Sequence, residues 1–273
     1  MITLKTKDET AKMREAGVIV AEMLASCRAA VRPGVTTAEL DRIAADVLKK
    51  RGATSNFKNY GVPVLPPFPG VICTSVNEQI VHGIPGKRKL RDGEIISIDA
   101  GAIVDGWHAD AAITVPVGTV SPEADRLIRV TEEALRRGIA AAQVGKRLGD
   151  IGAAVQKWVE SQGFAVVRNY VGHGIGRAMH EDPQVPNYGA AERGLQIKEG
   201  LCIAIEPMVN IGGPQTQTLD DKWTVVTADG SLSAHFEHTL WCTAKGPVVL
   251  TAPEGKAAVA ASTGFLAETA VAE

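Results

Sequence analysis

Two segments of equal length, residues 34–52 and 145–163, form an internal repeat that constrains the fold more than any other feature. Each runs from one glycine to another. In the first, Thr36 followed three residues later by Glu39 is a capping-box pattern, and Gly52 is typical of a helix C-terminus. Both segments carry apolar residues at i, i+4, i+7 and i+8, which predicts one buried helix face in each. The aligned residues are Leu40, Ala44, Val47 and Leu48 in the first segment and Ile151, Val155, Trp158 and Val159 in the second.

Further matches follow each predicted helix in the same order. HGIP at 82–85 corresponds to HGIG at 173–176. Each half then continues with a glycine, an apolar stretch and a carboxylate, which is Asp99 in the first half and Glu206 in the second. Helices and strands can resemble one another by chance, but matched histidines and acids favour a duplicated αβ unit. Carboxylates that end apolar strands in both halves are expected to converge on a shared charged site.

Each repeat unit is also preceded by a helix, predicted over about residues 9–29 in the first half. The second begins at Ser121-Pro122, a cap followed by proline at the first helical position. The prediction is a single mixed α/β domain over residues 1–250, with halves of about 1–117 and 118–250. Residues 251–273 are rich in alanine and poor in aromatic side chains, which predicts a flexible extension or a loosely docked helix.

Composition excludes several classes of function. The 273 residues carry a formal net charge of −2, which argues against nucleic acid as a main partner. No apolar run approaches the roughly 20 residues that span a bilayer, and the N-terminus lacks the apolar core of a signal peptide. The four cysteines are scattered without a C-x-x-C pair, which is typical of a reducing compartment and argues against cysteine-bound zinc. A cytoplasmic protein is therefore expected.

A carboxylate-bearing hairpin is predicted over residues 99–115. Asp105-Gly106, flanked by alternating apolar residues, is a strong signal for a two-residue turn. With that turn, Asp99 and Asp110 lie on one face as diagonal neighbours, roughly 7 Å apart at the backbone. Like charges at this spacing favour divalent cations between them, whereas two solvated acids on an exposed hairpin are the alternative.

The second half supplies two more acids. Glu206 ends the apolar stretch, and residues 234–241 are predicted to form another strand in which His235 and Glu237 share a face. Together with the two aspartates, these glutamates carry four negative charges, which two divalent cations would neutralise. One imidazole, that of His173, would add a nitrogen ligand. Such an oxygen-dominated set suits Mn, Fe(II) or Co, with zinc left open.

These residues occur in a recognisable order. The set Asp99, Asp110, His173, Glu206 and Glu237 resembles the metal ligands of the methionine aminopeptidases, which are pita-bread metallopeptidases. The resemblance covers roughly residues 5–250. The motifs that carry it are HGIP (82–85), IDAGAIVDGWHADAAIT (98–114), GHGIGRAMHEDP (172–183), IEPM (205–208) and HFEHT (235–239).

The resemblance implies a pita-bread fold, in which two pseudo-symmetric αβ halves surround a central antiparallel sheet. It implies removal of the initiator methionine from nascent proteins and peptides with a small second residue. Only 31 positions separate Glu206 from Glu237, so the long insertion of type II enzymes is absent and a bacterial type I form is expected. Prolidases share the ligand set but usually carry an extra N-terminal domain. Prolidase activity and a non-catalytic binding module are the alternatives.

The resemblance also implies two divalent ions, whether Co, Mn, Fe(II) or Zn. Asp110 and Glu237 would bridge them, Asp99 would bind mainly one, and His173 with Glu206 would bind the other. A hydroxide between the ions would be the nucleophile.

Three side chains are implied to act in catalysis. Glu206 would shuttle the proton. His82 and His180 would stabilise the peptide group and the tetrahedral intermediate from outside the metal shell. A structural hydrogen bond is the alternative role for each histidine.

An apolar, unbranched pocket for methionine is implied. Its residues would be Tyr60, Phe68, Cys73, Met179 and Trp223. The chain departs from the family pattern at Met179, where an aromatic residue is usual, and in the longer, proline-rich segment YGVPVLPPFPG at 60–70. Because proline restricts the backbone, that segment can be an ordered lid over the cleft. A tolerated surface insertion is an equally supported alternative.

The implied partners are peptides with N-terminal methionine and nascent chains, with transient association with the ribosome. Specific nucleic-acid binding and membrane binding are not expected, and the chain is expected to be a monomer. The glycine run GHGIGR at 172–177 lacks the spacing of a nucleotide-binding loop. Its glycines instead predict a tightly turning backbone beside the metal centre.

Overall fold

The computed structural model describes residues 2–61 and 65–255, which form four helices and fourteen strands. Among these residues, none of the helices has the length and apolar character needed to cross a bilayer. The helices are α1 (Lys7–Ala30), α2 (Thr37–Arg51), α3 (Pro122–Ala141) and α4 (Leu148–Ser161). The strands are β1 (Ile72–Val76), β2 (Gln79–Val81), β3 (Ile95–Val104), β4 (Trp107–Pro116), β5 (Ala165–Val166), β6 (Gly172–Gly174), β7 (Glu181–Val185), β8 (Cys202–Ile205), β9 (Met208–Asn210), β10 (Thr216–Thr218), β11 (Val225–Thr227), β12 (Ser233–His235), β13 (Glu237–Thr243) and β14 (Gly246–Val249).

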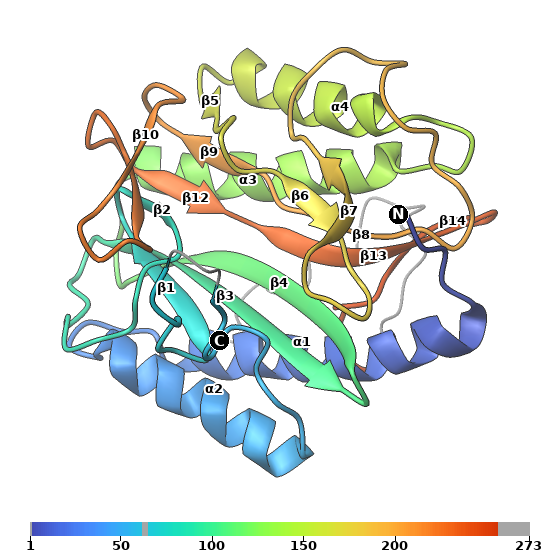
Figure 1. The fold of residues 1–273 in the computed structure, drawn as a ribbon. Helices are drawn as coiled ribbons and strands as arrows, with labels where there is room; N and C mark the ends of the chain where they lie inside the picture. The colour runs from blue at the N-terminus through green and yellow to red at the C-terminus, as the bar shows by residue number, and fades with distance from the viewer. Residues whose placement is uncertain (1, 62–64, 256–273) are drawn as a thin grey trace.

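One antiparallel sheet joins the two halves of the chain. Its order is β1-β3-β4-β13-β8-β6-β7, with β14 paired to β13, so the seam between the halves lies between β4 and β13. Helices α1 and α2 lie along the first-half strands, and α3 and α4 lie together at the opposite side of the molecule (Figure 1). Two small sheets, β10-β11-β2 and β12-β9-β5, complete the fold. The predicted architecture of two αβ halves around a central antiparallel sheet is confirmed.

Each half has its own hydrophobic core. One core packs α1 and α2 against β1, β3 and β4, and the other packs α3 and α4 against the second-half strands. Ile113 on β4 contacts both cores. The predicted helix faces are buried, except that Trp158 is half-buried and its indole N–H donates to the carbonyl of Val130 at 3.0 Å. The indole N–H needs a polar partner, and the backbone carbonyl of α3 that supplies it explains this departure from the repeat.

The predicted helix starts are found, but the repeat-equivalent helices begin differently. Thr36 caps α2, because its hydroxyl accepts the N–H of Glu39, while the Glu39 carboxylate accepts the N–H of Thr36. The equivalent residue before α4 is Arg147, whose N–H donates to Asp150 at 2.8 Å. An arginine side chain cannot accept a hydrogen bond, so α4 has only half of this arrangement.

The predicted hairpin has the expected register. Val104 pairs with Trp107 across the two-residue turn, which places Asp99 opposite Ala112. Asp105 and Gly106 have φ values of 50° and 75°, as a type I′ turn requires.

The predicted strand over residues 234–241 is wrong as a single element, since it divides at Phe236. The residues before the break form β12 and pair with β9, while those after it form β13 and pair with β4 and β8. The side chain of Thr114 takes both backbone groups of His235: its hydroxyl accepts the His235 N–H and donates to the His235 carbonyl, each at 2.8 Å. The ladder to β4 therefore starts only at Glu237, which pairs with Ala112.

The packed part of the chain extends past the predicted boundary at residue 250. Thr251 and Ala252 are buried. The guanidinium of Arg14 on α1 donates to the carbonyls of Leu250, Ala252 and Pro253. The remainder of the predicted tail, residues 256–273, lies outside the described residues, as do residues 62–64 of the proline-rich segment.

Candidate active site

The sheet register places acidic side chains from both halves on one face. Ala112 on β4 pairs with Asp99 on one side and with Glu237 on the other. Residues directly opposite in antiparallel strands project to the same face, so the two carboxyls flank a methyl group that leaves space between them. Glu206 directly follows β8, which pairs with β13. Asp110 on β4 is the fourth acid. Each half therefore supplies two, Asp99 and Asp110 from the first and Glu206 and Glu237 from the second.

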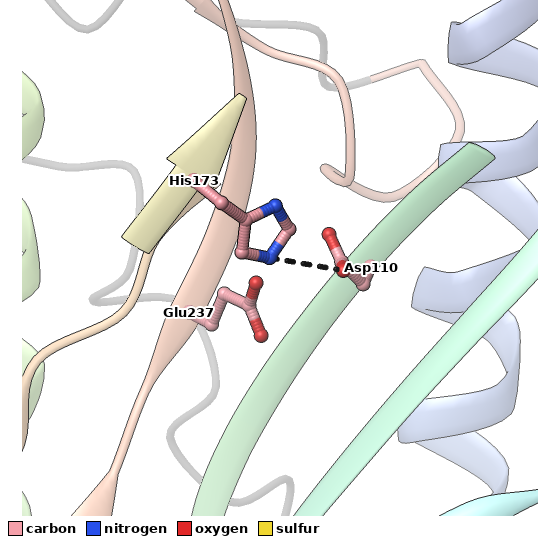
Figure 2. A group of neighbouring side chains, drawn as sticks. All are labelled: Asp110, His173 and Glu237. Carbon is pink, nitrogen blue, oxygen red and sulfur yellow. Dashed lines mark ion pairs between the residues drawn. The ribbon is translucent and has the colours of Figure 1, made fainter. Parts of the chain in front are cut away.

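Asp110, His173 and Glu237 form the centre of this cluster (Figure 2). Their ligating atoms all lie within 4.8 Å of one another. Nε2 of His173 lies 3.6 Å from Oδ2 of Asp110 and 3.6 Å from Oε1 of Glu206. These separations exceed hydrogen-bond distances, but an ion that binds each atom at about 2.0–2.2 Å can span them.

Two of the three central side chains, His173 and Asp110, are held in defined orientations. Nδ1 of His173 lies 2.9 Å from the carbonyl of Gly174, so Nδ1 carries the hydrogen and Nε2 presents its lone pair to the cluster. Thr239 on β13 fixes Asp110, since its hydroxyl lies 3.0 Å from Oδ1 and accepts the Asp110 N–H at 3.1 Å. The His173 contact is local, whereas the Thr239 contacts orient Asp110 from across the seam between β4 and β13.

The carboxyls are in an environment that disfavours their charge. Burial raises the pKa of Asp110 to about 6. Burial, and then the neighbouring carboxyl charges, raise the pKa values of Asp99, Glu206 and Glu237 well above their ordinary range. Oδ1 of Asp99 is buried and has no hydrogen-bond partner among the described residues. Bound cations reverse this unfavourable electrostatics, so the donor set fits divalent metal ions.

A cavity of about 170 Å³ adjoins the cluster. All the side chains predicted for the site line this one cavity, with the four acids and His173 at one end and aromatic and sulfur-containing groups at the other. The latter are the predicted Tyr60, Phe68, Cys73, Met179 and Trp223, which Phe57 joins in the same cluster. Since a cavity of about 150 Å³ holds one benzene molecule, a cavity of this volume has room for about one side chain.

His82 and His180 also line the cavity, and neither is hydrogen-bonded to an acid in the described residues. Desolvation, and then the neighbouring His173, lower the pKa of His180 to about 4. Burial lowers the pKa of His82 to about 4, with a smaller effect from His180. His82 has a φ of 60° and packs edge-on to Tyr170 and Trp223. Both rings are neutral at pH 7 and each has one N–H to donate.

The glycines of the 172–177 run are explained by close backbone approach. A Cβ on Gly172 would lie 2.3 Å from the carbonyl oxygen of Ala204, and one on Gly174 would lie 2.1 Å from that of Asp182. Neither separation is possible for a real side chain. The tight packing of β6 against its neighbours, on which the position of His173 depends, therefore needs glycine.

The sequence reasoning missed several cavity residues, of which His235 has the most chemistry. Its Nε2 is buried without a hydrogen-bond partner among the described residues and lies 3.9 Å from Oε2 of Glu206. Burial, and then His82, lower its pKa to about 3. In the sequence, His235 lies two positions before Glu237, and residues two apart in a strand share a face. This spacing could have identified it as a site residue. The other missed lining residues are Phe57, Val81, Tyr170 and Val171.

Comparisons with known proteins agree with this geometry. The family model of metallopeptidase family M24 matches residues 11–244. The methionine aminopeptidase of Clostridium perfringens is 52% identical over 252 residues, which are 92% of this chain and 99% of that protein. The chain belongs to the methionine aminopeptidases of family M24. Methionine aminopeptidase 1 of Bacillus subtilis is 51% identical, with 92% and 99% covered.

Solved structures of this family have the same fold. The methionine aminopeptidase of Thermotoga maritima superposes with a TM-score of 0.89 at 43% identity, covering 92% of this chain and 99% of that one. The prolidase of Pyrococcus furiosus superposes with a TM-score of 0.72 at 21% identity, covering 66% of its own chain, which shows a shared fold alone. Membership of the methionine aminopeptidases makes the chain a metal-dependent hydrolase and confirms the resemblance drawn from the motifs.

Proposed function

We propose that this chain removes N-terminal methionine from peptides and nascent proteins whose second residue is small. The observation that carries the proposal is the cavity, which has room for about one side chain and is lined by apolar groups at one end and by acids and imidazoles at the other. An unbranched thioether fits the apolar end, where Cys73 and Met179 are polarisable neighbours. The scissile peptide group would then lie against the acidic end.

Two divalent ions are proposed, held by Asp110 and Glu237 between them, with Asp99 on one side and His173 and Glu206 on the other. When bound, such ions supply an activated water and polarise the scissile carbonyl. Their identity is proposed to be Mn, Fe(II), Co or Zn, because carboxylates with one imidazole suit these metals.

The proton is proposed to move through Glu206. Its carboxyl lies at the acidic end of the cavity, where Oε1 is 3.6 Å from Nε2 of His173, so it is placed beside the attacking water and the scissile peptide group. It is therefore suited to take a proton from the attacking water and to deliver it to the leaving amine. His82 and His180 are proposed to donate N–H groups to the oxygen that becomes negative in the tetrahedral intermediate.

Nascent chains are the proposed physiological substrates, met in the cytoplasm through transient contact with the ribosome. The chain is proposed to act as a monomer, because all the site residues above come from one chain.

A peptide panel tests the proposal. The purified chain is assayed with Mn(II), Co(II) or Fe(II) on Met-Ala-Ser, Met-Leu-Ser and Leu-Ala-Ser, and on Xaa-Pro dipeptides. Release of methionine from the first peptide alone is expected. Cleavage of the Xaa-Pro dipeptides without cleavage of Met-Ala-Ser would favour prolidase activity. Metal analysis provides a separate check, since absence of bound metal and of stabilisation by added metal would favour a binding module.

A further inference from the structure

Tyr60 joins the two halves of the molecule through one hydrogen bond at the cavity. Its hydroxyl lies 2.8 Å from Nδ1 of His180. The two rings meet edge to face, with their centroids 5.5 Å apart. Tyr60 precedes β1 in the first half, and His180 precedes β7 in the second. The contact therefore links a first-half loop to a second-half histidine.

The position of Tyr60 is set by backbone contacts. The N–H of Asn59 donates to the carbonyl of Phe68, and the N–H of Phe68 donates to the carbonyl of Tyr60, each at 2.8 Å. The indole N–H of Trp223 donates to the carbonyl of Pro66 at 2.9 Å. The two ends of the segment are thus closed on each other and attached to the second half, which holds the Tyr60 side chain over the cavity.

We propose that Tyr60 is a positioning residue that sets the tautomer and the orientation of His180. When the tyrosine hydroxyl donates to Nδ1, the ring hydrogen of a neutral imidazole resides on Nε2. Nε2–H is then the donor available to the substrate, and no partner for Nε2 is found within residues 2–61 and 65–255. This inference rests on the proposed role of His180 as a donor to the substrate.

The hydroxyl of Tyr60 makes it possible to distinguish the positioning of His180 from the lining of the pocket, to which only the ring contributes. A phenylalanine at position 60 would present the same ring to the cavity and would lose only the hydrogen bond to His180. Without that bond the imidazole can populate both tautomers and can rotate, since the other ring packed against it in the described part of the chain is the edge-on ring of His173, whose centroid lies 4.4 Å away. The orientation of the donor would then be lost without loss of the pocket.

The first test is the tautomer of His180 in the unmodified chain. Nitrogen-15 NMR of the histidine-labelled, Zn(II)-loaded protein reports which ring nitrogen carries the hydrogen, and His180→Gln assigns the signal. We expect the hydrogen on Nε2. A hydrogen on Nδ1 would overturn the proposal, because Tyr60 would then be an acceptor and Nε2 would have nothing to donate. This measurement requires neither turnover nor a Tyr60 variant.

The second test compares Tyr60→Phe with Tyr188→Phe. Tyr188 also donates one hydrogen bond, to the carbonyl of Arg168 at 3.2 Å, but it does not line the cavity. Loss of one hydrogen bond at the site should lower kcat of Tyr60→Phe by about three- to tenfold, with a smaller change in KM. Its metal content should be unchanged, and its His180 signal should shift towards a mixture of tautomers. Tyr188→Phe should retain normal kcat.

The outcomes are distinguishable. An unchanged tautomer and an unchanged kcat in Tyr60→Phe, or an increase in KM alone, would leave Tyr60 as a pocket wall and overturn the positioning role. If the unmodified chain did not release methionine at all, the proposed function would fail instead. The tautomer of His180 would still decide whether Tyr60 orients it.

Discussion

The two halves place their acids on the same sheet face by different means. In the first half, Asp99 and Asp110 belong to one hairpin whose turn is two residues long. In the second half, Glu206 and Glu237 are 31 positions apart, and the strand that carries Glu237 begins only after a break at Phe236. A local turn sets the first pair, whereas contacts with the other half set the second. The two halves therefore build one site although their acids are positioned by different kinds of contact.

The largest expected effect comes from removing one proposed metal ligand from each half, which tests whether both halves are needed to bind metal. Asp99→Ala and Glu237→Ala should each abolish turnover and metal loading together. Removing a residue that only supports a metal ligand lowers metal affinity or activity by about 10–100-fold. Removing a ligand itself should therefore lower activity by more than about 100-fold. The measurements are methionine release and metal content by mass spectrometry. If one variant retained full metal, the other half alone would hold the ions.

The next effect concerns the histidines outside the proposed ligand set, one from each half. His82→Ala and His180→Ala should each lower kcat by roughly 100-fold, because each removes a donor aimed at the developing charge. Both variants should retain metal, which dialysis followed by metal analysis measures. An empty site in His180→Ala would show that this imidazole is a ligand.

In the metal-free chain, the acids brought together across the seam should lower the free energy of unfolding. Acids whose pKa is raised on folding keep protons that the unfolded chain loses above about pH 4, so they cause stability to fall as pH rises. The buried histidines, with pKa values lowered to about 4, 3 and 4 for His82, His235 and His238, act in the opposite direction, but only below their ordinary value of 6.5. Above pH 6.5 the acids set the slope, and the buried thiols, whose pKa values are also raised by burial, add to the same trend only as pH approaches their ordinary value of 9.0.

The expected result is a Tm of the metal-free chain that falls as pH rises above 6.5, because Asp99, Glu206 and Glu237 have pKa values raised well above their ordinary range. Metal-loaded protein should lack this fall, because bound cations keep the carboxylates ionised. Thermal unfolding with and without a chelator measures both. Glu206→Gln should flatten the slope of the metal-free chain. A slope of the opposite sign would mean that the acids are ionised even without metal.

The smallest effect compares repeat-equivalent helix starts. Thr36→Ala should lower the free energy of unfolding by about 1 kcal/mol, because it removes the acceptor for the Glu39 N–H. Arg147→Ala should cost less than about 0.5 kcal/mol, since its exposed side chain caps no helix N–H. Urea unfolding measures both. Equal losses would mean that the capping hydroxyl adds nothing in the first half.

Much of the site could be predicted because its determinants are local. The Asp105-Gly106 turn set the register of β3 and β4, and strand alternation then placed Asp99 and Asp110 on one face. The same alternation places His235 on the face of Glu237, which is the signal for its presence in the cavity. The break at Phe236 had no local signal, since it depends on the side chain of Thr114 more than a hundred positions earlier.

Periodicity, caps and turn residues depend on neighbours in the chain, so the sequence by itself determined the helices, the hairpin register and the family. Only the tertiary structure decided that Tyr60 meets His180, that Arg14 holds the segment after Leu250, and that β13 begins at Glu237. Each of these contacts joins residues distant in sequence. Their energies depend on distances and burial that arise only when the two halves pack together.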